Sequence, residues 1–271
     1  MQTPQYEFYK SPFDGYPSFD LKTVDWTELK RHASSPGMWL RRMSPRHMPR
    51  LLALGLGQLR SLCLRDIDAS DLGMLSSFPD LEELQVWQSR KITRLDGIET
   101  ATGLRWLCLS ELGTLESLDP LRALRKLERL LVTGGVWKDQ LLNCEFAPIG
   151  SLKSLTALCI TNVRGPVDLS PLLELDQLTD LALAPAFFPV QEIAKLAARF
   201  PFWREQRPWI RALNDDFGAC SSCGSSKTAV LLQRKKHIYC SKCDAAILKR
   251  TLDSFDHEIE IQQALLRKNR L

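Results

Sequence analysis

Two neighbouring stretches decide the fold: 59-LRSLCL-64 and 81-LEELQV-86 share leucine or valine at their first, fourth and sixth positions. The same pattern returns as 104-LRWLCL-109, 127-LERLLV-132, 155-LTALCI-160 and 178-LTDLAL-183. The six copies begin 22, 23, 23, 28 and 23 residues apart. A nearly fixed period of this length indicates a stacked repeat architecture.

The alternation inside each copy has the period of a β-strand, so its apolar residues face one side and the intervening residues face the other. Stacked copies would bury one another's leucines in a continuous interior that no single copy could form. The pattern resembles the leucine-rich repeat family in its short form of about 22 to 23 residues, over residues 51–200. This resemblance implies an α/β solenoid with parallel strands on its concave face.

The rest of the chain divides into two ends. Residues 1–50 lack the repeat and are expected to cap the solenoid, with Asp25 placed to cap a short helix whose Trp26 and Leu29 dock on the first coil. Residues 201–271 are expected to form a zinc-ribbon-like module followed by an amphipathic helix. Apolar residues recur at helical spacing in that helix: Ile247, Leu248, Leu252, Phe255, Ile259 and Leu266.

The turns and one insertion depart from the family pattern. The asparagine that often follows each strand in the family is present only as Asn162, so other groups must satisfy the remaining turns. The fourth unit is five residues longer than its neighbours, and we expect its extra residues to leave the solenoid as a surface loop that carries Trp137.

The residues between the leucines face outward on the concave side, and they include an apparently exposed Leu131. Trp and Arg are the residue types that most often anchor protein interfaces. We therefore expect a partner-binding patch with these members: Arg65, Trp87, Trp106, Arg129 and Trp137. The alternative is that the Trp rings cover neighbouring backbone or pack against the N-terminal segment.

Three cysteines occupy the same middle position of their units, at Cys63, Cys108 and Cys159. Consecutive members are two strands apart, about 9.6 Å at the usual strand spacing, whereas a disulfide needs Cα atoms within about 7 Å. We therefore interpret them as small apolar fillers of a crowded sheet.

The C-terminal module contains two Cys-x-x-Cys pairs, Cys220 with Cys223 and Cys240 with Cys243, separated by 16 residues. This spacing is typical of a tetrahedral zinc site in which a hairpin over 227–233 and 235–240 returns the second pair to the first. Four thiolates fill the coordination shell, so the sequence predicts structural Zn²⁺, with iron or no metal as the alternatives. A thioredoxin-like redox site is disfavoured because neither pair is expected at the head of a helix in a βαβ unit.

Net charge and composition say little about the function. The chain of 271 residues has a net charge of +4, although residues 30–65 contain eight Lys or Arg and no acid. No apolar run of about 18 residues and no apolar leader is found, which favours a cytoplasmic protein with no membrane partner.

No catalytic motif is present, and we expect a binding protein and no enzyme. A ring-type ubiquitin ligase would need eight zinc ligands, whereas four cysteines cluster here. Small bacterial leucine-rich repeat proteins are often inhibitors, so the resemblance implies a cytosolic inhibitor or immunity protein that neutralises a cognate protein such as a toxin. The alternative is nucleic-acid binding by the basic residues of the ribbon: Arg234, Lys235, Lys236 and Lys242.

Overall fold

The computed structural model describes residues 12–135, 138–213, 218–232 and 235–268, with the side chains of 235 and 236 left out. The chain divides into two compact units. One comprises residues 1–166 with 174–182, and the other comprises residues 167–173 with 183–271. We call them the repeat unit and the C-terminal unit.

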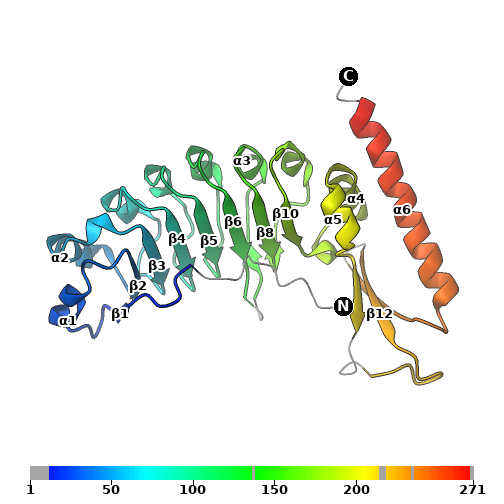
Figure 1. Ribbon diagram of the computed structural model, residues 1–271, viewed down its shortest axis with the longest axis horizontal. Helices are drawn as coiled ribbons and strands as arrows, with labels where there is room; N and C mark the ends of the chain where they lie inside the picture. The colour runs from blue at the N-terminus through cyan, green and yellow to red at the C-terminus, as the bar shows by residue number, and fades with distance from the viewer. Residues whose placement is uncertain (1–11, 136–137, 214–217, 233–234, 269–271) are drawn as a thin grey trace. The chain divides into compact units, whose positions relative to one another are not determined.

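The repeat unit is built on one sheet whose strands follow one another in chain order (Figure 1). Its strands are β1 (Ser18–Asp20), β2 (Gly37–Arg41), β3 (Ser61–Arg65), β4 (Glu83–Trp87), β5 (Trp106–Ser110), β6 (Arg129–Thr133), β8 (Ala157–Thr161) and β10 (Asp180–Leu183). Neighbours from β1 to β8 pair in parallel. The predicted leucine-rich repeat solenoid is confirmed.

The repeat leucines meet in register across the sheet. Leu62 pairs with Leu84, Leu84 with Leu107, and Leu107 with Leu130. Each of these side chains is fully buried. Burying a leucine contributes about 1.5 to 3 kcal/mol, so the interior of the stacked coils stabilises this unit.

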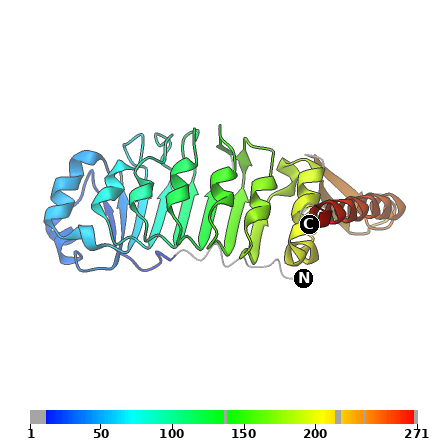
Figure 2. The same cartoon turned by 90° about the horizontal axis from the view of Figure 1, so that it is seen from above.

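Short helical segments close the coils on the side opposite the sheet, and in Figure 2 the successive coils lie side by side in one row. The α-helices among them are α2 (Met48–Ala53) and α3 (Ala147–Gly150). The 3₁₀ segments of this unit are η2 (Pro45–His47), η3 (Leu56–Gln58), η4 (Gly73–Ser77), η5 (Ile98–Thr100) and η6 (Asp119–Ala123), whereas most of η7 (Ser170–Glu174) belongs to the C-terminal unit. Their apolar residues, such as Leu75 and Ile98, complete the interior.

The N-terminal region does more than cap the solenoid. Its strands β1 and β2 extend the parallel sheet, so the sheet begins well before residue 51. The alternation of Met38 and Leu40, both fully buried, is the signal in the sequence for β2. The predicted helix is confirmed as α1 (Trp26–Arg31), with the Asp25 carboxylate accepting the Thr27 N–H at 2.8 Å.

Two buried polar side chains satisfy the turns that lack asparagine. The Ser89 hydroxyl accepts the Ile67 N–H at 3.2 Å and donates to the Trp87 carbonyl at 3.0 Å. Gln140 is 2% exposed, and its Oε1 accepts the Leu112 N–H at 2.8 Å. Its Nε2 also donates to the Gly113 carbonyl, at 2.6 Å.

Gln140 also changes the interpretation of the insertion, because it belongs to β7 (Gln140–Leu141), which pairs in parallel with β9 (Val163–Arg164). The longer fourth unit is therefore only partly a surface loop, since it returns to the solenoid as a second, two-stranded sheet.

The C-terminal unit combines helices with a three-stranded antiparallel sheet. Its elements are η8 (Pro185–Phe187), α4 (Val190–Arg199), α5 (Pro201–Gln206), β11 (Ile210–Leu213), β12 (Lys227–Leu232), β13 (Lys235–Cys240) and α6 (Ala245–Lys268). The strand order is β11, β12, β13, so the predicted hairpin is confirmed and gains a third strand.

Aromatic side chains form the core of this unit. Trp203 and Trp209 are fully buried with ring centroids 5.7 Å apart, and Trp209 contacts Phe255 of α6 at 5.0 Å. The predicted amphipathic helix is confirmed as α6, which packs against α4. Its inward face is narrower than expected, because Ile247 is 52% exposed. No helix within the described ranges is long and apolar enough to cross a membrane.

Candidate functional site

The four cysteines of the C-terminal unit meet at one point. Cys220 and Cys223 lie in the turn before β12, Cys240 ends β13, and Cys243 lies just before α6. Pairing of β12 with β13 sets Lys227 opposite Cys240, which returns the second pair to the first. Gly224 has a φ of +70° and closes the first turn, with its N–H donating to the Cys220 carbonyl at 2.8 Å.

The distances among the sulfurs fit a tetrahedral metal ion. All four Sγ atoms lie within 4.8 Å of one another. The Cys220 and Cys243 sulfurs are 3.9 Å apart, and those of Cys223 and Cys240 are 3.4 Å apart. Zinc–sulfur bonds of about 2.3 Å place tetrahedral ligands about 3.8 Å apart. The cluster can therefore hold a metal ion, and the residues present fit Zn²⁺.

Backbone and electrostatics also prepare the site for a cation. The Cys240 sulfur accepts the Lys242 and Cys243 N–H groups at 3.4 and 3.3 Å. Hydrogen bonds from Ser225 lower the pKa of Cys223 to about 6, whereas the neighbouring sulfurs, Cys223 first, raise the pKa of Cys243 to about 12. Four thiolates this close need a positive charge among them, and a divalent ion supplies it.

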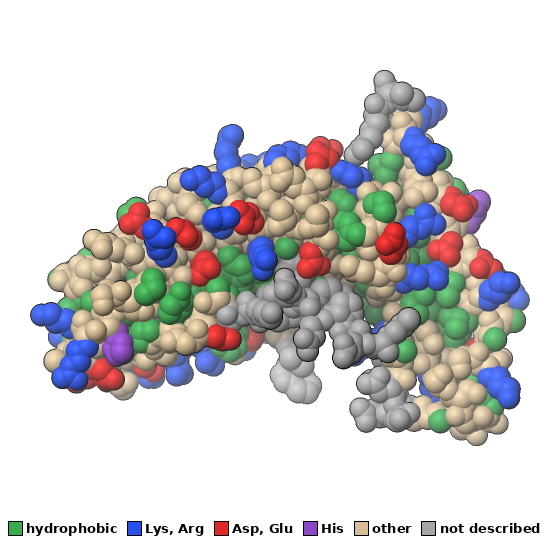
Figure 3. Space-filling model, viewed as in Figure 1, with side chains coloured by type: hydrophobic (Ala, Val, Ile, Leu, Met, Phe, Trp, Pro, Cys, Tyr) green, Lys and Arg blue, Asp and Glu red, His purple; other side chains and the backbone are tan. Residues whose placement is uncertain are grey.

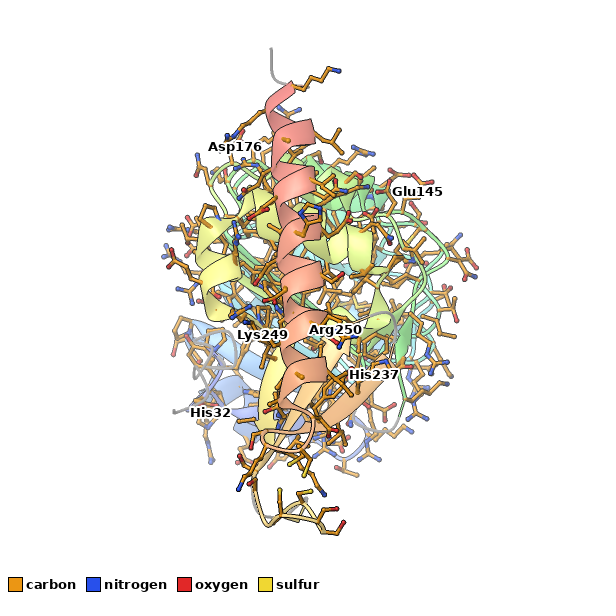
Figure 4. All side chains as sticks on the ribbon, turned by 90° about the vertical axis from the view of Figure 1, so that its right-hand side faces the viewer. His32, Glu145, Asp176, His237, Lys249 and Arg250 are labelled. Carbon is orange, nitrogen blue, oxygen red and sulfur yellow. The ribbon has the colours of Figure 1, made fainter. Side chains whose placement is uncertain are left out.

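The second pair meets one of the two conditions for a thioredoxin-like redox site and not the other. The second pair does lie at the head of a helix, because α6 begins two residues after Cys243. The strand before it is antiparallel, however, so the pair has no βαβ unit of the thioredoxin kind. His237, labelled in Figure 4, is not part of the four-sulfur group and stacks on Tyr239 instead.

The basic residues considered for nucleic-acid contact are mostly outside the described parts of the chain. This holds for Arg234 and for the side chains of Lys235 and Lys236. Lys242 is exposed beside the sulfur cluster.

The concave face of the sheet is more closed than the sequence indicates. Phe13 is fully buried in a cluster with Cys63, Cys108 and Leu131, and its ring contacts Trp106 edge-on at 5.6 Å. Trp106 is only 8% exposed. The N-terminal segment therefore packs on the Trp106 ring, which is the alternative to partner binding.

The expected exposure of Leu131 was also wrong, since this side chain is 3% exposed. The three cysteines of the middle row are buried, which agrees with their role as fillers. Burial raises the pKa of the Cys63 and Cys108 thiols, that of Cys108 to about 12, so these groups are poor nucleophiles in the intact protein. Sequence reasoning missed Phe13, although it lies in a conspicuously aromatic stretch between residues 6 and 19.

Arg65 and Trp87 form a fixed, partly exposed pair at the end of β3 and β4. The guanidinium carbon of Arg65 lies 4.3 Å from the centroid of the Trp87 ring. Its Nε donates to Gln88 Oε1 at 2.9 Å, and the Trp87 indole N–H donates to Glu111 Oε1 at 3.0 Å. Both side chains are therefore held in place while part of their surface stays in water.

The other expected members of the patch are less constrained. Arg129 is exposed on β6, opposite Trp106 on one side and Ala157 on the other. No ion pair to it occurs within the described ranges. Trp137 lies outside the described residues. The structure thus brings Arg65 and Trp87 together, and it separates them from Trp106, which is covered.

No family model matches this chain, and no curated protein matches it. Several solved structures resemble it at low identity. Internalin C2 from Listeria monocytogenes is 18% identical with a TM-score of 0.41, over 53% of this chain and 59% of that one. The plant peptide hormone receptor RGFR1 in complex with RGF2 is 15% identical with a TM-score of 0.40, over 62% and 26%. A leucine-rich repeat protein of Leptospira interrogans is 16% identical with a TM-score of 0.32, over 66% and 56%. The chain spans less than two thirds of each of these structures.

Proposed function

We propose that this chain is a protein-binding module and that it acts as a cytosolic inhibitor, of the immunity-protein kind, by binding and neutralising a cognate protein such as a toxin. It is proposed to bind and not to catalyse. The observation that carries the proposal is the Arg65–Trp87 pair, because each side chain is fixed by hydrogen bonds to a neighbouring coil and still exposed.

Preorganisation is the reason why this pair suits an interface. A side chain that is already ordered loses little conformational freedom when a partner covers it. Trp and Arg are also the residue types that most often dominate binding free energy, at 2 kcal/mol or more each. Arg129, exposed on the same sheet face, extends the proposed surface along the coils.

The metal cluster supports this role without taking part in it. Four sulfur ligands leave no open coordination position, so a bound zinc ion would be structural and would order the C-terminal unit. The proposed role of zinc is therefore to stabilise the fold of the C-terminal unit.

The test is rescue of growth when this chain is expressed together with each protein encoded beside it in its source genome. We expect the wild-type chain to suppress the toxicity of one such protein and to bind it in pure form. The double variant Arg65→Ala/Trp87→Ala should bind at least about a hundredfold more weakly.

The chain offers a matched control for this variant. Arg50 lies 4.1 Å above the ring of Trp26, on helices α2 and α1 and outside the sheet. The variant Arg50→Ala/Trp26→Ala removes the same two residue types, and it should keep binding and rescue intact. Equal loss in both double variants, or no neighbour that is toxic and bound, would refute the proposal.

A further inference from the structure

The turns after β2, β3 and β4 form a continuous edge next to the Arg65–Trp87 pair. The residue after each strand, Arg42, Asp66 and Gln88, is in the left-handed conformation with a φ of 53, 52 and 50°. Their N–H groups donate to the last carbonyl of the next strand at 2.9, 3.1 and 3.0 Å. These bonds hold the three turns in register, about 4.8 Å apart.

A groove of ≈ 550 Å³ runs along this edge, and basic side chains dominate its lining. Seven of the lining residues are Lys or Arg, against the two acids Asp66 and Asp68. Arg42 pairs with Asp20, and Lys91 pairs with Asp68 at 2.6 Å. The remaining five basic groups have no ion pair within the described ranges: Lys22, Arg41, Arg46, Arg65 and Arg90.

This surplus contrasts with other arginines of the solenoid. Arg105 pairs with Glu128 of the next coil at 2.6 Å, and Arg60 pairs with Glu82 at 3.4 Å. Figure 3 shows basic and acidic side chains interspersed over the coils. An external anion would give the five basic groups of the groove equivalent partners.

Lys22 and Arg46 come from outside the repeats and converge on the same carboxylate. Both lie near enough to Asp68 to help Lys91 hold the pKa of that carboxyl below its usual range. The N-terminal region therefore contributes cations to an edge that the repeats alone would leave less charged.

We propose that this groove binds an acidic peptide segment on the surface of the protein partner, an inference that rests on the proposed function. Arg65 belongs to both the groove and the Arg65–Trp87 pair, so the two surfaces are continuous. Four of the five unpaired groups are arginines, whose planar guanidinium groups bind carboxylates through two hydrogen bonds.

The acids within the groove favour a peptide over a nucleic acid. The Asp66 carboxylate lies in the middle of the row and can accept hydrogen bonds from peptide N–H groups, whereas a phosphate backbone offers it no donor. The row ends at Glu111, which follows β5 in the same left-handed position. The cationic edge thus spans three coils, about 10 Å, which suits a short peptide segment and is too short for a track of phosphates.

The test uses the full chain with three probes in a fluorescence anisotropy titration: a labelled oligoglutamate peptide, its glutamine counterpart, and single-stranded DNA of equal charge. We expect the oligoglutamate peptide to bind, the glutamine peptide not to bind, and DNA to bind more weakly than oligoglutamate. Affinity should fall with added salt because the groups are exposed.

A matched pair of triple variants separates a site from a general charge effect. Arg41→Gln/Arg46→Gln/Arg90→Gln should weaken oligoglutamate binding by about tenfold or more, because three screened charge contacts are lost. Arg60→Gln/Arg105→Gln/Arg122→Gln removes the same charge from exposed arginines that are paired elsewhere, and it should change binding less than about twofold.

Three results would overturn the inference: equal weakening in both triple variants, tighter binding of DNA than of oligoglutamate, or no binding of oligoglutamate at low salt. These results are distinguishable from failure of the proposed function, because the peptide assay needs no natural partner. Loss of growth rescue with intact peptide binding would sink the proposed function and leave the groove assignment standing.

Discussion

Replacing Phe13 with alanine should open the concave face of the sheet. Phe13 is fully buried, and its ring contacts those of Tyr16, Trp39 and Trp106 with centroids 6.5, 6.0 and 5.6 Å away. Its carbonyl also accepts the indole N–H of Trp39 at 3.0 Å. The ring contacts help to hold the N-terminal segment on the sheet. Alanine removes them and keeps the carbonyl, so the segment should be released locally while the coils stay folded.

The size of the effect follows from the buried ring. A buried Phe→Ala substitution costs about 3 to 5 kcal/mol, and a surface segment that can rearrange lies at or below the lower end. We expect the free energy of local opening to fall by about 2 to 3 kcal/mol, which corresponds to an open population larger by about 30-fold to 150-fold.

Alkylation of individual cysteines, followed by mass spectrometry, measures this opening. Cys108 belongs to the same buried cluster as Phe13. Its labelling should be about 30-fold to 150-fold faster in Phe13→Ala, in proportion to the larger open population. Exposure should also return its raised pKa toward the ordinary value and increase the reactive thiolate fraction. Cys144, half-buried outside this cluster, provides an internal reference for global unfolding.

A variant in the other unit completes the design. Phe202 is a half-buried phenylalanine of α5, and Phe202→Ala should leave Cys108 labelling unchanged. If Cys108 reacts at the wild-type rate in Phe13→Ala, or if Cys144 accelerates equally, the Phe13 contacts do not close the concave face.

Two further predictions concern the turns and the metal. Gln140→Ala should lower the free energy of unfolding of the repeat unit by about 2 to 4 kcal/mol in urea titrations, because it leaves a buried N–H and a partly buried carbonyl without this partner. The exposed Gln58→Ala should change it by less than about 0.5 kcal/mol, and equal effects would contradict the assignment. Purified protein should contain one zinc ion per chain by mass spectrometry, and a chelator should expose the amides of β11, β12 and β13 to hydrogen exchange. The variant Cys223→Ser should lose zinc, whereas the control Cys144→Ser should keep it. A protein without metal whose three strands are still fully protected from exchange would contradict the site.

The periodic parts of the molecule could be predicted from the sequence. The strands from β3 to β10 carry the leucine alternation, and each copy repeats the same physical demand for burial by its neighbours. The four cysteines were equally informative, since zinc ligation fixes both residue type and spacing. Asp25 was predictable as a helix cap because capping is a local interaction within two residues.

The parts that could not be predicted depend on contacts between distant residues. The alternation along its strand predicts an exposed Trp106, but Phe13, which is 93 residues earlier in the chain, covers it. Gln140 serves a turn 28 residues away, so no local pattern indicates its role. The groove joins Lys22 and Arg46 to residues of two later coils, which only the stacked structure brings together.

Hydrogen exchange of the chain with and without its bound partner tests the central claim most directly. Binding by the sheet face predicts slower exchange in the peptides over residues 41–46, 61–66 and 83–88, with little change in the helical segments such as α2 and η5. Protection confined to the helical side of the coils, or to residues 220–243 of the sulfur cluster, would contradict a partner-binding surface at the sheet.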